Sequence, residues 1–313
     1  MTSLQTVQQH NDEAGLDGKT LLHDRVAIVT GAGKGIGRAY ALELAARGAK
    51  VLVNNRRHAG EADAQTSAQQ VVEAIAAAGG VALANFEPVD AAGAGENMVQ
   101  QALSAFGRID IIVANAALSQ AASFHKQSLD AFMAIFNVGF RGTLDLLHAA
   151  WPHLRAQTYG RVVVTTSSAG RYGNHGLGAY AASKGAIEML MRSLAAEGIG
   201  SNIRVNAISP YAATQMTEAY LPANLAAHLQ PAAVAPMVAW LCSADCNVNG
   251  EVIVAAGGRY RRAFSVETDS VAGTDCEQVV TTLASRSGRP HADANAAFTS
   301  LVDELRAGGP LQP

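Results

Sequence analysis

The feature that most constrains the fold is a regular alternation of short apolar runs, rich in β-branched residues, with longer segments of helical periodicity. The runs predict strands that are buried on both faces. Strands of that kind joined by helices form a parallel sheet covered by helices on both sides. The runs span 26–30, 51–54, 81–85, 109–114, 162–166, 203–208 and 252–254, and the helical segments span 37–47, 68–78, 96–106, 129–154, 181–197 and 232–241. We therefore predict one doubly wound α/β domain over 24–258, with extensions at 1–23 and 259–313.

Composition removes several classes of protein from consideration. The 313 residues are 49% hydrophobic and 16% charged, which is typical of a globular chain and not of a disordered or collagen-like one. The net charge of −3 offers no basic footprint for nucleic acid. No run approaches the roughly 18 apolar residues that span a bilayer, and the polar N-terminus lacks the pattern of a secretory signal. Three cysteines (Cys242, Cys246 and Cys276) are too few for a disulfide framework and lack zinc-ligand spacing, which predicts a metal-free cytoplasmic protein.

A glycine-rich stretch follows the first predicted strand and leads directly into a helix. Residues 30–37 read TGAGKGIG. Glycines permit a tight turn and a close approach of the backbone to a pyrophosphate, while free N–H groups at the helix N-terminus bind the phosphates. Because the stretch lies in a strand–turn–helix unit, it predicts a dinucleotide site. The residues predicted to contact the cofactor here are Gly31, Gly33, Lys34, Gly35, Ile36 and Gly37.

The end of the second strand indicates which cofactor to expect. An acidic residue at this place holds the ribose 2′-hydroxyl of NAD, but this chain reads Asn54-Asn55-Arg56-Arg57. Asn55 can hydrogen-bond a sugar, Arg56 matches the geometry of a phosphate, and Lys34 reaches the same place as a point charge. Two cations without a carboxylate predict NADP(H) in preference to NAD(H). The alternative is that Arg56 and Arg57 are solvated loop charges.

A tyrosine and a lysine stand four residues apart in a later predicted helix. This spacing places the phenol of Tyr180 and the ammonium of Lys184 on one helical face. A tyrosine with a reference pKa of about 10 is a poor acid or base near neutral pH, and a nearby cation stabilises its phenolate. Ser167 ends a predicted strand thirteen residues before Tyr180 and could hold a substrate oxygen. A tyrosine and a lysine at this spacing are common in proteins and alone are a weak signal of a catalytic site. In combination with the glycine-rich turn, in this order and spacing, they are a strong one.

In these motifs the sequence resembles the short-chain dehydrogenase/reductase family over about residues 24–258. The matching residues are Thr30-Gly-x-x-x-Gly35-x-Gly37, Asn115-Ala-Ala, Asn137, Ser167, Tyr180-x-x-x-Lys184 and Pro210-x-x-x-Thr214-x-Met216. The resemblance implies a Rossmann fold with a seven-stranded parallel sheet. It also implies a catalytic tetrad of Asn137, Ser167, Tyr180 and Lys184, with further cofactor contacts from Asn115, Pro210 and Thr214.

The resemblance further implies how the tetrad works. Hydride passes between the nicotinamide and a carbonyl carbon while Tyr180 exchanges a proton with the oxygen, and Ser167 hydrogen-bonds that oxygen. Lys184 would bind the nicotinamide ribose and lower the pKa of Tyr180. Asn137 would hold a water that relays protons to Lys184, and Thr214 would contact the carboxamide.

Three positions depart from the family pattern. The usual Asn-Asn-Ala-Gly after the fourth strand reads Ala114-Asn115-Ala116-Ala117, and Asn115 is still expected to line the adenosine side. The adenine-contacting Asp-Val step reads Glu87-Pro88, and Pro88 has no N–H to offer. Tyr211 replaces a glycine and is predicted to point its ring towards the substrate. His175 is a further substrate candidate, or else a loop histidine.

Several stretches also resemble the dehydrogenase module of peroxisomal multifunctional β-oxidation enzymes, which implies activity on (3R)-hydroxyacyl-CoA or 17β-hydroxysteroids. They lie at 37–40, 149–151, 172–174, 201–203 and 235–242. That group usually carries Asp at the position of Asn55, whereas Arg56 and the glycine-rich turn resemble NADPH-dependent carbonyl reductases. The leading hypothesis is an NADP(H)-dependent enzyme that interconverts a ketone and a secondary alcohol on a bulky hydrophobic substrate, such as a 3-oxoacyl thioester, steroid or aromatic ketone. The alternatives are an NAD-linked (3R)-hydroxyacyl-CoA dehydrogenase and a non-catalytic nucleotide-binding sensor.

The remaining segments bear on assembly. The predicted helix at 129–154 is apolar almost all round, so it is either a deeply buried central helix or part of a subunit interface. Together with the helix at 181–197 it predicts a homodimer or homotetramer that binds a small molecule and neither nucleic acid nor membrane. The apolar segment 220–229 suits a hydrophobic substrate or is a short surface connection. The tail contains one amphipathic helix, predicted at 295–305.

Overall fold

The computed structural model describes residues 21–58, 60–62, 65–217 and 221–307. By its contacts the chain divides into two compact units, 1–262 and 263–313. Most of the predicted extension at 1–23 lies outside the described residues. Leu22 is described and is fully buried in the core of the first unit, so the packed part of this unit begins at least two residues before the predicted boundary.

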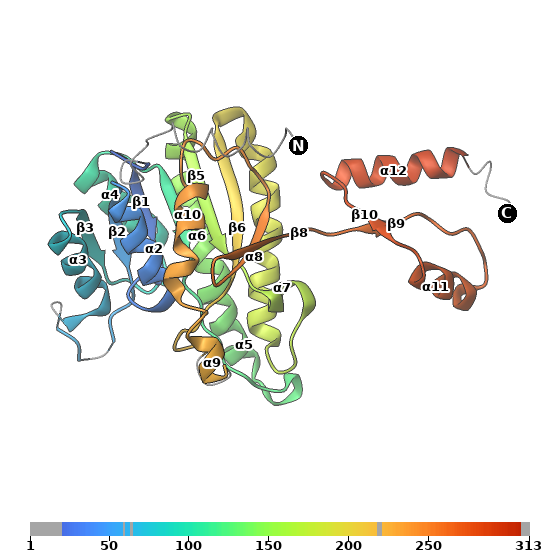
Figure 1. Cartoon of the computed structure of the whole chain (residues 1–313), viewed down its shortest axis with the longest axis horizontal. Coiled ribbons are helices and arrows are strands. Elements are labelled where there is room, and N and C mark those ends of the chain that lie inside the picture. Colours follow the sequence, from blue (N-terminus) through green and yellow to red (C-terminus); the bar gives the residue numbers. More distant parts are fainter. Residues whose placement is uncertain (1–20, 59, 63–64, 218–220, 308–313) are drawn as a thin grey trace, which may run out of the picture. The chain divides into compact units, whose positions relative to one another are not determined.

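The first unit is built on a twisted sheet with strand order β3-β2-β1-β4-β5-β6-β7-β8 (Figure 1). The strands are β1 Val26–Val29, β2 Lys50–Asn54, β3 Val81–Asn85, β4 Ile111–Ala114, β5 Gly160–Thr165, β6 Ile203–Tyr211, β7 Val252–Ala256 and β8 Arg259–Ala263. The pairs from β3 to β7 are all parallel. Every residue of β1, β4 and β5 is buried, as the unbroken apolar runs predict. The predicted Rossmann fold is confirmed.

Helices cover both faces of this sheet (Figure 1). On one face α2 contacts α3 and α10, and on the other α4 packs on α6 while α8 packs on α5, β5 and β6. These helices are α2 Gly35–Ala46, α3 Ser67–Ala77, α4 Ala94–Phe106, α5 Leu129–Phe136, α6 Gly142–Ala156, α8 Gly178–Gly198 and α10 Ala235–Leu241. Two shorter helices are α7 Ser168–Tyr172 and α9 Ala223–Ala226.

The direction of chain progression reverses between β1 and β4, which are neighbours in the sheet. In a doubly wound sheet such a reversal opens a crevice at the carboxyl ends of the strands, and ligands bind there. The glycine-rich turn after β1 and Asn115 after β4 both lie at this point. The topology alone therefore locates the site.

The sheet contains one strand more than predicted. Gly257 and Gly258 have φ of 52° and 75° and connect β7 to β8 as a two-residue hairpin. The β8 sequence, Arg-Tyr-Arg-Arg-Ala, is mostly exposed and has no apolar run. At this edge Arg262 donates from Nε to Oε2 of Glu251 over 2.6 Å. Residues 259–263, predicted only as part of an extension, therefore form an edge strand of the sheet.

The long helix predicted at 129–154 is interrupted. α5 ends at Phe136, a π-helical segment covers Asn137–Arg141, and α6 continues from Gly142. Gly139 packs there against α8, since a Cβ on Gly139 would lie 2.6 Å from Oγ of Ser183. Single π-turns inside helices occur most often at functional sites. α6 is well buried, whereas Leu129 is 78% exposed, so the burial expected for a central helix applies only to the second half.

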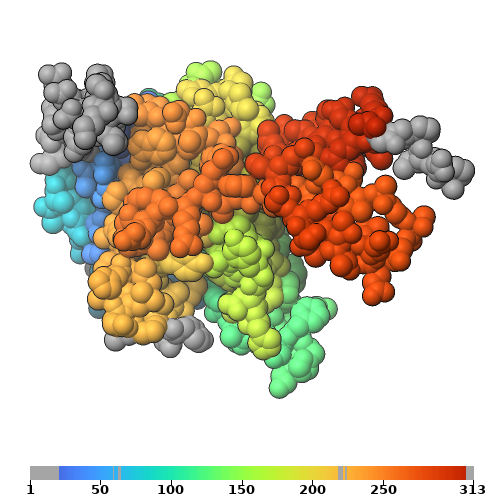
Figure 2. Space-filling model, turned by 45° about the vertical axis from the view of Figure 1, so that its right-hand side comes forward, coloured from blue at the N-terminus to red at the C-terminus, as the bar shows by residue number. Residues whose placement is uncertain are grey.

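The second unit contains short elements. A two-stranded antiparallel sheet pairs β9 Glu267–Thr268 with β10 Gly288–Arg289, and the helices are α11 Cys276–Ala284 and α12 Ala294–Ala307. Asp275 caps α11 by accepting hydrogen bonds from two backbone N–H groups. α12 confirms the helix predicted at 295–305. No residue of α11 or α12 is buried. This unit is coloured orange to red in Figure 2.

Candidate active site

A cleft of about 440 Å³ opens at the carboxyl ends of the parallel strands. It is lined by the glycine-rich turn, by segments that follow β4, β5 and β6, and by the first turns of α8. A smaller cavity of about 90 Å³ shares Gly31, Asn55, Arg56 and residues 116–118 with the cleft. The two cavities therefore adjoin.

Most of the predicted site residues come together in this cleft. Its lining includes Gly31, Lys34, Gly35, Ile36, Gly37, Asn55, Arg56, Asn115, Ser167, Tyr180, Lys184, Pro210 and Thr214. Five predicted residues line neither cavity, namely Gly33, Glu87, Asn137, His175 and Tyr211.

The glycine-rich turn is packed so closely that side chains do not fit. Gly31 has φ of +62°, and a Cβ on it would lie 2.9 Å from Cα of Ala116. A Cβ on Gly37 would lie 2.2 Å from the carbonyl oxygen of Gly31. A Cβ on Gly33 would lie 2.2 Å from Oγ of Ser67. Gly33 thus lets the turn pack on α3, although it does not itself line the cleft.

Asn115 fixes this turn from the neighbouring strand. Its backbone N–H donates to Oγ1 of Thr30 over 3.0 Å, and its side-chain Nδ2 donates to the carbonyl oxygens of Thr30 and Gly31 over 3.2 Å. The side chain therefore braces the loop across the β1–β4 reversal, in addition to lining the cleft.

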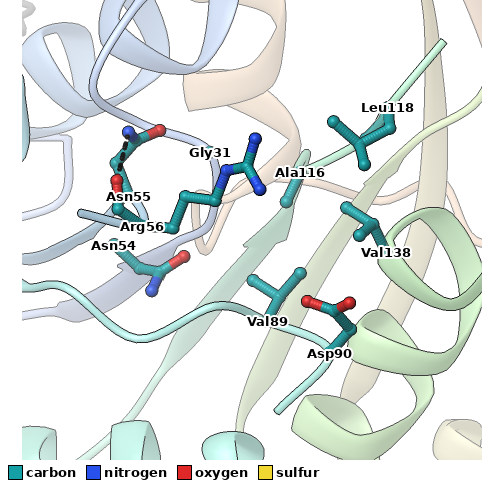
Figure 3. Close-up of a pocket in the computed structure, with 10 residues that line it drawn as sticks. Gly31, Asn54, Asn55, Arg56, Val89, Asp90, Ala116, Leu118 and Val138 are labelled. Atoms are coloured by element: carbon teal, nitrogen blue, oxygen red, sulfur yellow. Dashed lines mark hydrogen bonds between the residues drawn. The ribbon is translucent and has the colours of Figure 1, made fainter. Parts of the chain in front are cut away.

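One end of the site gathers cationic side chains. Lys34, Arg56 and His58 are exposed and line the cleft, while Nδ2 of Asn55 donates to Oγ of Ser67 over 2.9 Å. Sequence reasoning did not single out His58, since a lone histidine after two arginines has no distinctive pattern. In Figure 3 Arg56 extends over the smaller cavity.

A carboxylate that sequence reasoning missed lines the smaller cavity. Asp90 lies across it from Asn54 and Arg56 (Figure 3). The expectation of two cations without any acid is therefore incomplete, because the loop after β3 reaches the same edge of the sheet as the end of β2. Glu87, the residue predicted to contact adenine, lines neither cavity. Its Oε1 accepts a hydrogen bond from Asn97 over 3.0 Å, and its Oε2 is buried without a hydrogen-bond partner in the described part of the chain.

The other end gathers the predicted catalytic side chains. Ser167 follows β5 and caps α7, with its Oγ accepting from the N–H of Ala169 over 3.2 Å. Tyr180 and Lys184 occupy the first turns of α8. The Lys184 ammonium is buried and donates to the carbonyl oxygen of Thr165 over 2.7 Å. Its Nζ lies 5.8 Å from the centre of the Tyr180 ring.

Burial dominates the protonation of this cluster. It lowers the pKa of Lys184 from 10.5 to about 8, because the charged form loses its hydration. Burial also raises the pKa of Tyr180, and a hydrogen bond with Ser167 opposes that rise without reversing it. In this structure the Lys184 ammonium is directed at the Thr165 carbonyl, and its effect on the pKa of Tyr180 stays a prediction.

A buried ion pair ties α7 to α8 behind the catalytic side chains. Nη1 of Arg171 lies 3.2 Å from Oε2 of Glu188, and its Nη2 donates to Oγ of Ser209 over 3.1 Å. The Thr166 hydroxyl, which has one hydrogen to donate, lies within hydrogen-bond distance of two acceptors, the same Glu188 oxygen at 3.1 Å and the carbonyl oxygen of Lys184 at 3.0 Å. The segment that carries Ser167 is thereby held against the helix that carries Tyr180. This pair gave no sequence signal.

Asn137 lies at the start of the π-helical segment, outside both cavities. The packing of Gly139 on Ser183 joins this segment to α8 beside Lys184. The structure thus brings Asn137 near the lysine's helix but not into the cleft.

The segment after β6 forms the far wall of the cleft. Residues 214–217 line it, and Oγ1 of Thr217 braces this turn by donating to the carbonyl oxygen of Ala212 over 2.7 Å. His175 and Tyr211 are exposed and do not line the cleft, and their contacts with a substrate stay predictions. The predicted apolar segment at 220–229 lies in part outside the described residues, and its described portion contains α9.

The cysteines take no part in the site. Cys242 and Cys246 are buried, and burial raises the pKa of both thiols. Among the described residues no group of histidine, cysteine or carboxylate side chains could hold a metal ion. The same part of the chain contains no helix that is long and apolar enough to cross a membrane.

Comparisons with known proteins identify relatives. The family model for short chain dehydrogenases matches residues 25–224. A protein of Mycobacterium tuberculosis assigned to the short-chain type dehydrogenase/reductases is 43% identical over 243 residues, which is 77% of this chain and 85% of that protein. The peroxisomal multifunctional enzyme type 2 of Drosophila melanogaster is 36% identical over 309 residues, covering 94% of this chain. The chain spans 51% of the length of that enzyme.

A solved structure supports the same relationship. A crystal structure from Beutenbergia cavernae, assigned as an NAD(P)-dependent gluconate 5-dehydrogenase and containing NADP at low occupancy, matches with a TM-score of 0.68 and 31% identity. The match covers 77% of this chain and 98% of that one. Identity above 30% over most of the chain, together with the same fold, is a family relationship and not only a shared architecture.

Proposed function

This chain belongs to the short-chain dehydrogenase/reductase family, and we propose that it interconverts a ketone and a secondary alcohol with NADP(H) on a bulky hydrophobic substrate. Membership makes it an oxidoreductase of CH–OH groups with a fold that binds NAD(P). The observation that carries the proposal is the convergence of Ser167, Tyr180 and Lys184 in the cleft that Lys34 and Arg56 border.

The glycine-rich turn fits a dinucleotide. The absence of side chains at Gly31 and Gly37 leaves the backbone open to a pyrophosphate, and α2 begins at Gly35 with free N–H groups directed at the same place. When bound, the nicotinamide supplies or accepts the hydride. Lys184 would hold the adjoining ribose through its ammonium, which lies at the base of the cleft.

Tyr180 and Ser167 would handle the proton and the oxygen. In the reductive direction the Tyr180 phenol donates its proton to the carbonyl oxygen, and the Ser167 hydroxyl donates a hydrogen bond to the same atom. Burial raises the pKa of the phenol in the chain by itself, so Tyr180 is protonated at neutral pH but is a weaker acid than an exposed tyrosine. Asn137 lies in the π-helical segment that packs on the helix of Lys184. It would be a positioning residue that holds the water through which protons pass to Lys184.

The preference for NADP(H) rests on charge. Lys34 and Arg56 lie on the rim where the adenosine ribose would sit, and Asn55 offers no carboxylate to repel a 2′-phosphate. A hydrophobic substrate is supported by the side chains of Leu118 and Met216 in the cleft lining.

We further expect that the chain forms a homodimer or homotetramer through α5, α6 and α8. Size-exclusion chromatography with light scattering would measure the number of subunits.

The test compares kcat/KM for NADPH and NADH on a panel of 3-oxoacyl thioesters, steroids and aromatic ketones. We expect NADPH to be favoured, and Arg56→Asp to lower the NADPH/NADH ratio by about 100-fold, which is of the order of two charge-assisted hydrogen bonds. Tyr180→Phe should lower kcat by roughly 10²- to 10⁴-fold while NADPH binding persists. Equal use of both cofactors by the unmodified protein would refute the NADP(H) preference.

A second candidate is an NAD-linked (3R)-hydroxyacyl-CoA dehydrogenase. The similarity to the Drosophila peroxisomal multifunctional enzyme, which extends over nearly the whole chain, favours it. Turnover of (3R)-hydroxyacyl-CoA with NAD⁺, at a kcat/KM above that of any ketone with NADPH, would select this candidate. Binding of NADPH without turnover of any substrate on the panel would instead favour a non-catalytic nucleotide-binding sensor.

A further inference from the structure

The smaller cavity ends at a buried oxygen atom that lacks a partner. Asn54 is 1% exposed and lines this cavity, and its Oδ1 accepts no hydrogen bond from any residue that the structure describes. Its Nδ2 donates to Oδ1 of Asn85 over 2.7 Å and to the carbonyl oxygen of Glu87 over 2.9 Å. A buried acceptor left without a donor costs about 1–3 kcal/mol, so a ligand that supplies the donor gains by binding there.

A chain of amides fixes which atom of Asn54 faces the cavity. Nε2 of Gln101 donates to the backbone carbonyl of Ala84 over 3.0 Å, so Oε1 of Gln101 must be the atom that accepts from Nδ2 of Asn85 over 2.7 Å. Oδ1 of Asn85 is then left to accept from Asn54. Because a backbone carbonyl can only accept, it sets the direction of the whole relay. The Asn54 oxygen is therefore held toward the cavity (Figure 3).

A second acceptor faces the same space. Asp90 lines the cavity, and its carboxylate makes no hydrogen bond or ion pair with any residue in the described part of the chain. Figure 3 shows it across the cavity from Asn54, with the buried side chain of Val89 between them. Arg56 comes from the opposite side, over the mouth of the cavity. The inner wall thus presents two acceptor groups around an apolar floor.

This arrangement matches a flat heterocycle whose edge carries an amino group. The N6 amino group of adenine donates two hydrogen bonds, whereas hypoxanthine carries a carbonyl oxygen at the same position. We propose that Asn54 Oδ1 and the Asp90 carboxylate select the adenine base of the cofactor by accepting from its amino group, an inference that rests on the proposed dinucleotide function.

The test measures binding, not turnover. Dissociation constants of the purified protein are determined by isothermal titration calorimetry for NADP⁺ and NAD⁺ and for their hypoxanthine analogues, deamino-NADP⁺ and deamino-NAD⁺. We expect the adenine form to bind at least tenfold more tightly within each pair, because the hypoxanthine oxygen faces two acceptors. The ratio within a pair does not depend on the 2′-phosphate, so a failure of the NADP(H) preference leaves this test intact.

Asp90→Asn is the decisive variant, since the new amide can donate to the hypoxanthine oxygen. It should reduce the adenine/hypoxanthine ratio at least threefold in both pairs. Asp245→Asn removes the same charge from an exposed position outside both cavities and should leave the ratio unchanged. Asn54→Val should also reduce the ratio, provided that a thermal melt shows a folded protein. A ratio within twofold of one in the unmodified protein, or equal effects of Asp90→Asn and Asp245→Asn, would overturn the proposal.

Discussion

Replacing Lys184 by methionine is expected to abolish catalysis and at the same time to stabilise the fold at neutral pH. The Lys184 ammonium is buried at the base of the cleft, where its one hydrogen bond goes to the Thr165 carbonyl. Burial lowers its pKa from 10.5 to about 8. A charged group held in the interior against this preference is a cost to folding, and methionine has a similar length without the charge.

The magnitude follows from the pKa shift. Each pKa unit corresponds to about 1.4 kcal/mol, so the buried ammonium costs roughly 3 kcal/mol below pH 8. Methionine removes this cost but leaves the Thr165 carbonyl unbonded, at about 1–3 kcal/mol. Between pH 8 and 10.5 the unfolded chain still binds the proton while the folded chain has released it, so the stability of the unmodified protein rises with pH in this window. The stability difference between the two proteins should change by roughly 2–3 kcal/mol from pH 7 to pH 10.

Urea unfolding followed by circular dichroism at several pH values measures this difference. Lys126→Met is the matched control, because Lys126 is exposed and its removal should give a difference that is flat with pH. The methionine variant should have a higher free energy of unfolding than the unmodified protein at pH 7, and this difference should disappear by pH 10. A difference for Lys184→Met that varies by less than about 0.5 kcal/mol over this range would show that Lys184 is hydrated, and would refute the reasoning.

Two further predictions concern packing around the site. Glu188→Ala leaves the charge of Arg171 buried without its partner and should lower the free energy of unfolding by about 3–5 kcal/mol. Replacing both residues by leucine should restore most of that loss. Urea titration of the unmodified protein and the two variants measures this, and equal losses in both variants would contradict the argument. Gly37→Ala favours the helix by its propensity, yet its Cβ would lie 2.2 Å from the carbonyl oxygen of Gly31. It should weaken NADPH binding at least tenfold in a fluorescence titration, and unchanged binding would show that the turn can relax.

The sequence predicted the main sheet because its pattern is a direct record of burial. Unbroken apolar runs identify strands covered on both faces, and parallel strands place all their carboxyl ends at one edge. This rule alone brings the turn after β1, Asn115 after β4 and Ser167 after β5 into one cleft, although they are far apart in the chain. The helical spacing of Tyr180 and Lys184 then supplies the rest of the cluster.

Features without an apolar pattern were missed. β8 is an edge strand of exposed arginines, so its burial pattern carries no signal, and only the two glycines before it indicate the hairpin. The π-helical segment at 137–141 has the same apolar periodicity as the helices on either side, and nothing in the sequence marks the additional residue per turn. Asp90 lies in a polar loop after β3, where one carboxylate looks like any other until the strand ends are brought together.

The positions of the buried charged side chains indicate where the chemistry takes place, independently of the sequence motifs and of the fold class. Several charged side chains are buried in the first unit, and three of them, Lys184, Glu188 and the largely buried Arg171, lie around α7 and α8 within a short stretch of chain. Glu188 and Arg171 neutralise each other, so removing one is costly while removing both is not. Lys184 has no such partner among the described residues, because its hydrogen bond goes to a neutral carbonyl. A cost of roughly 3 kcal/mol is large against the total stability of a domain, and a charge kept at that cost in a cleft is best explained by the chemistry performed there.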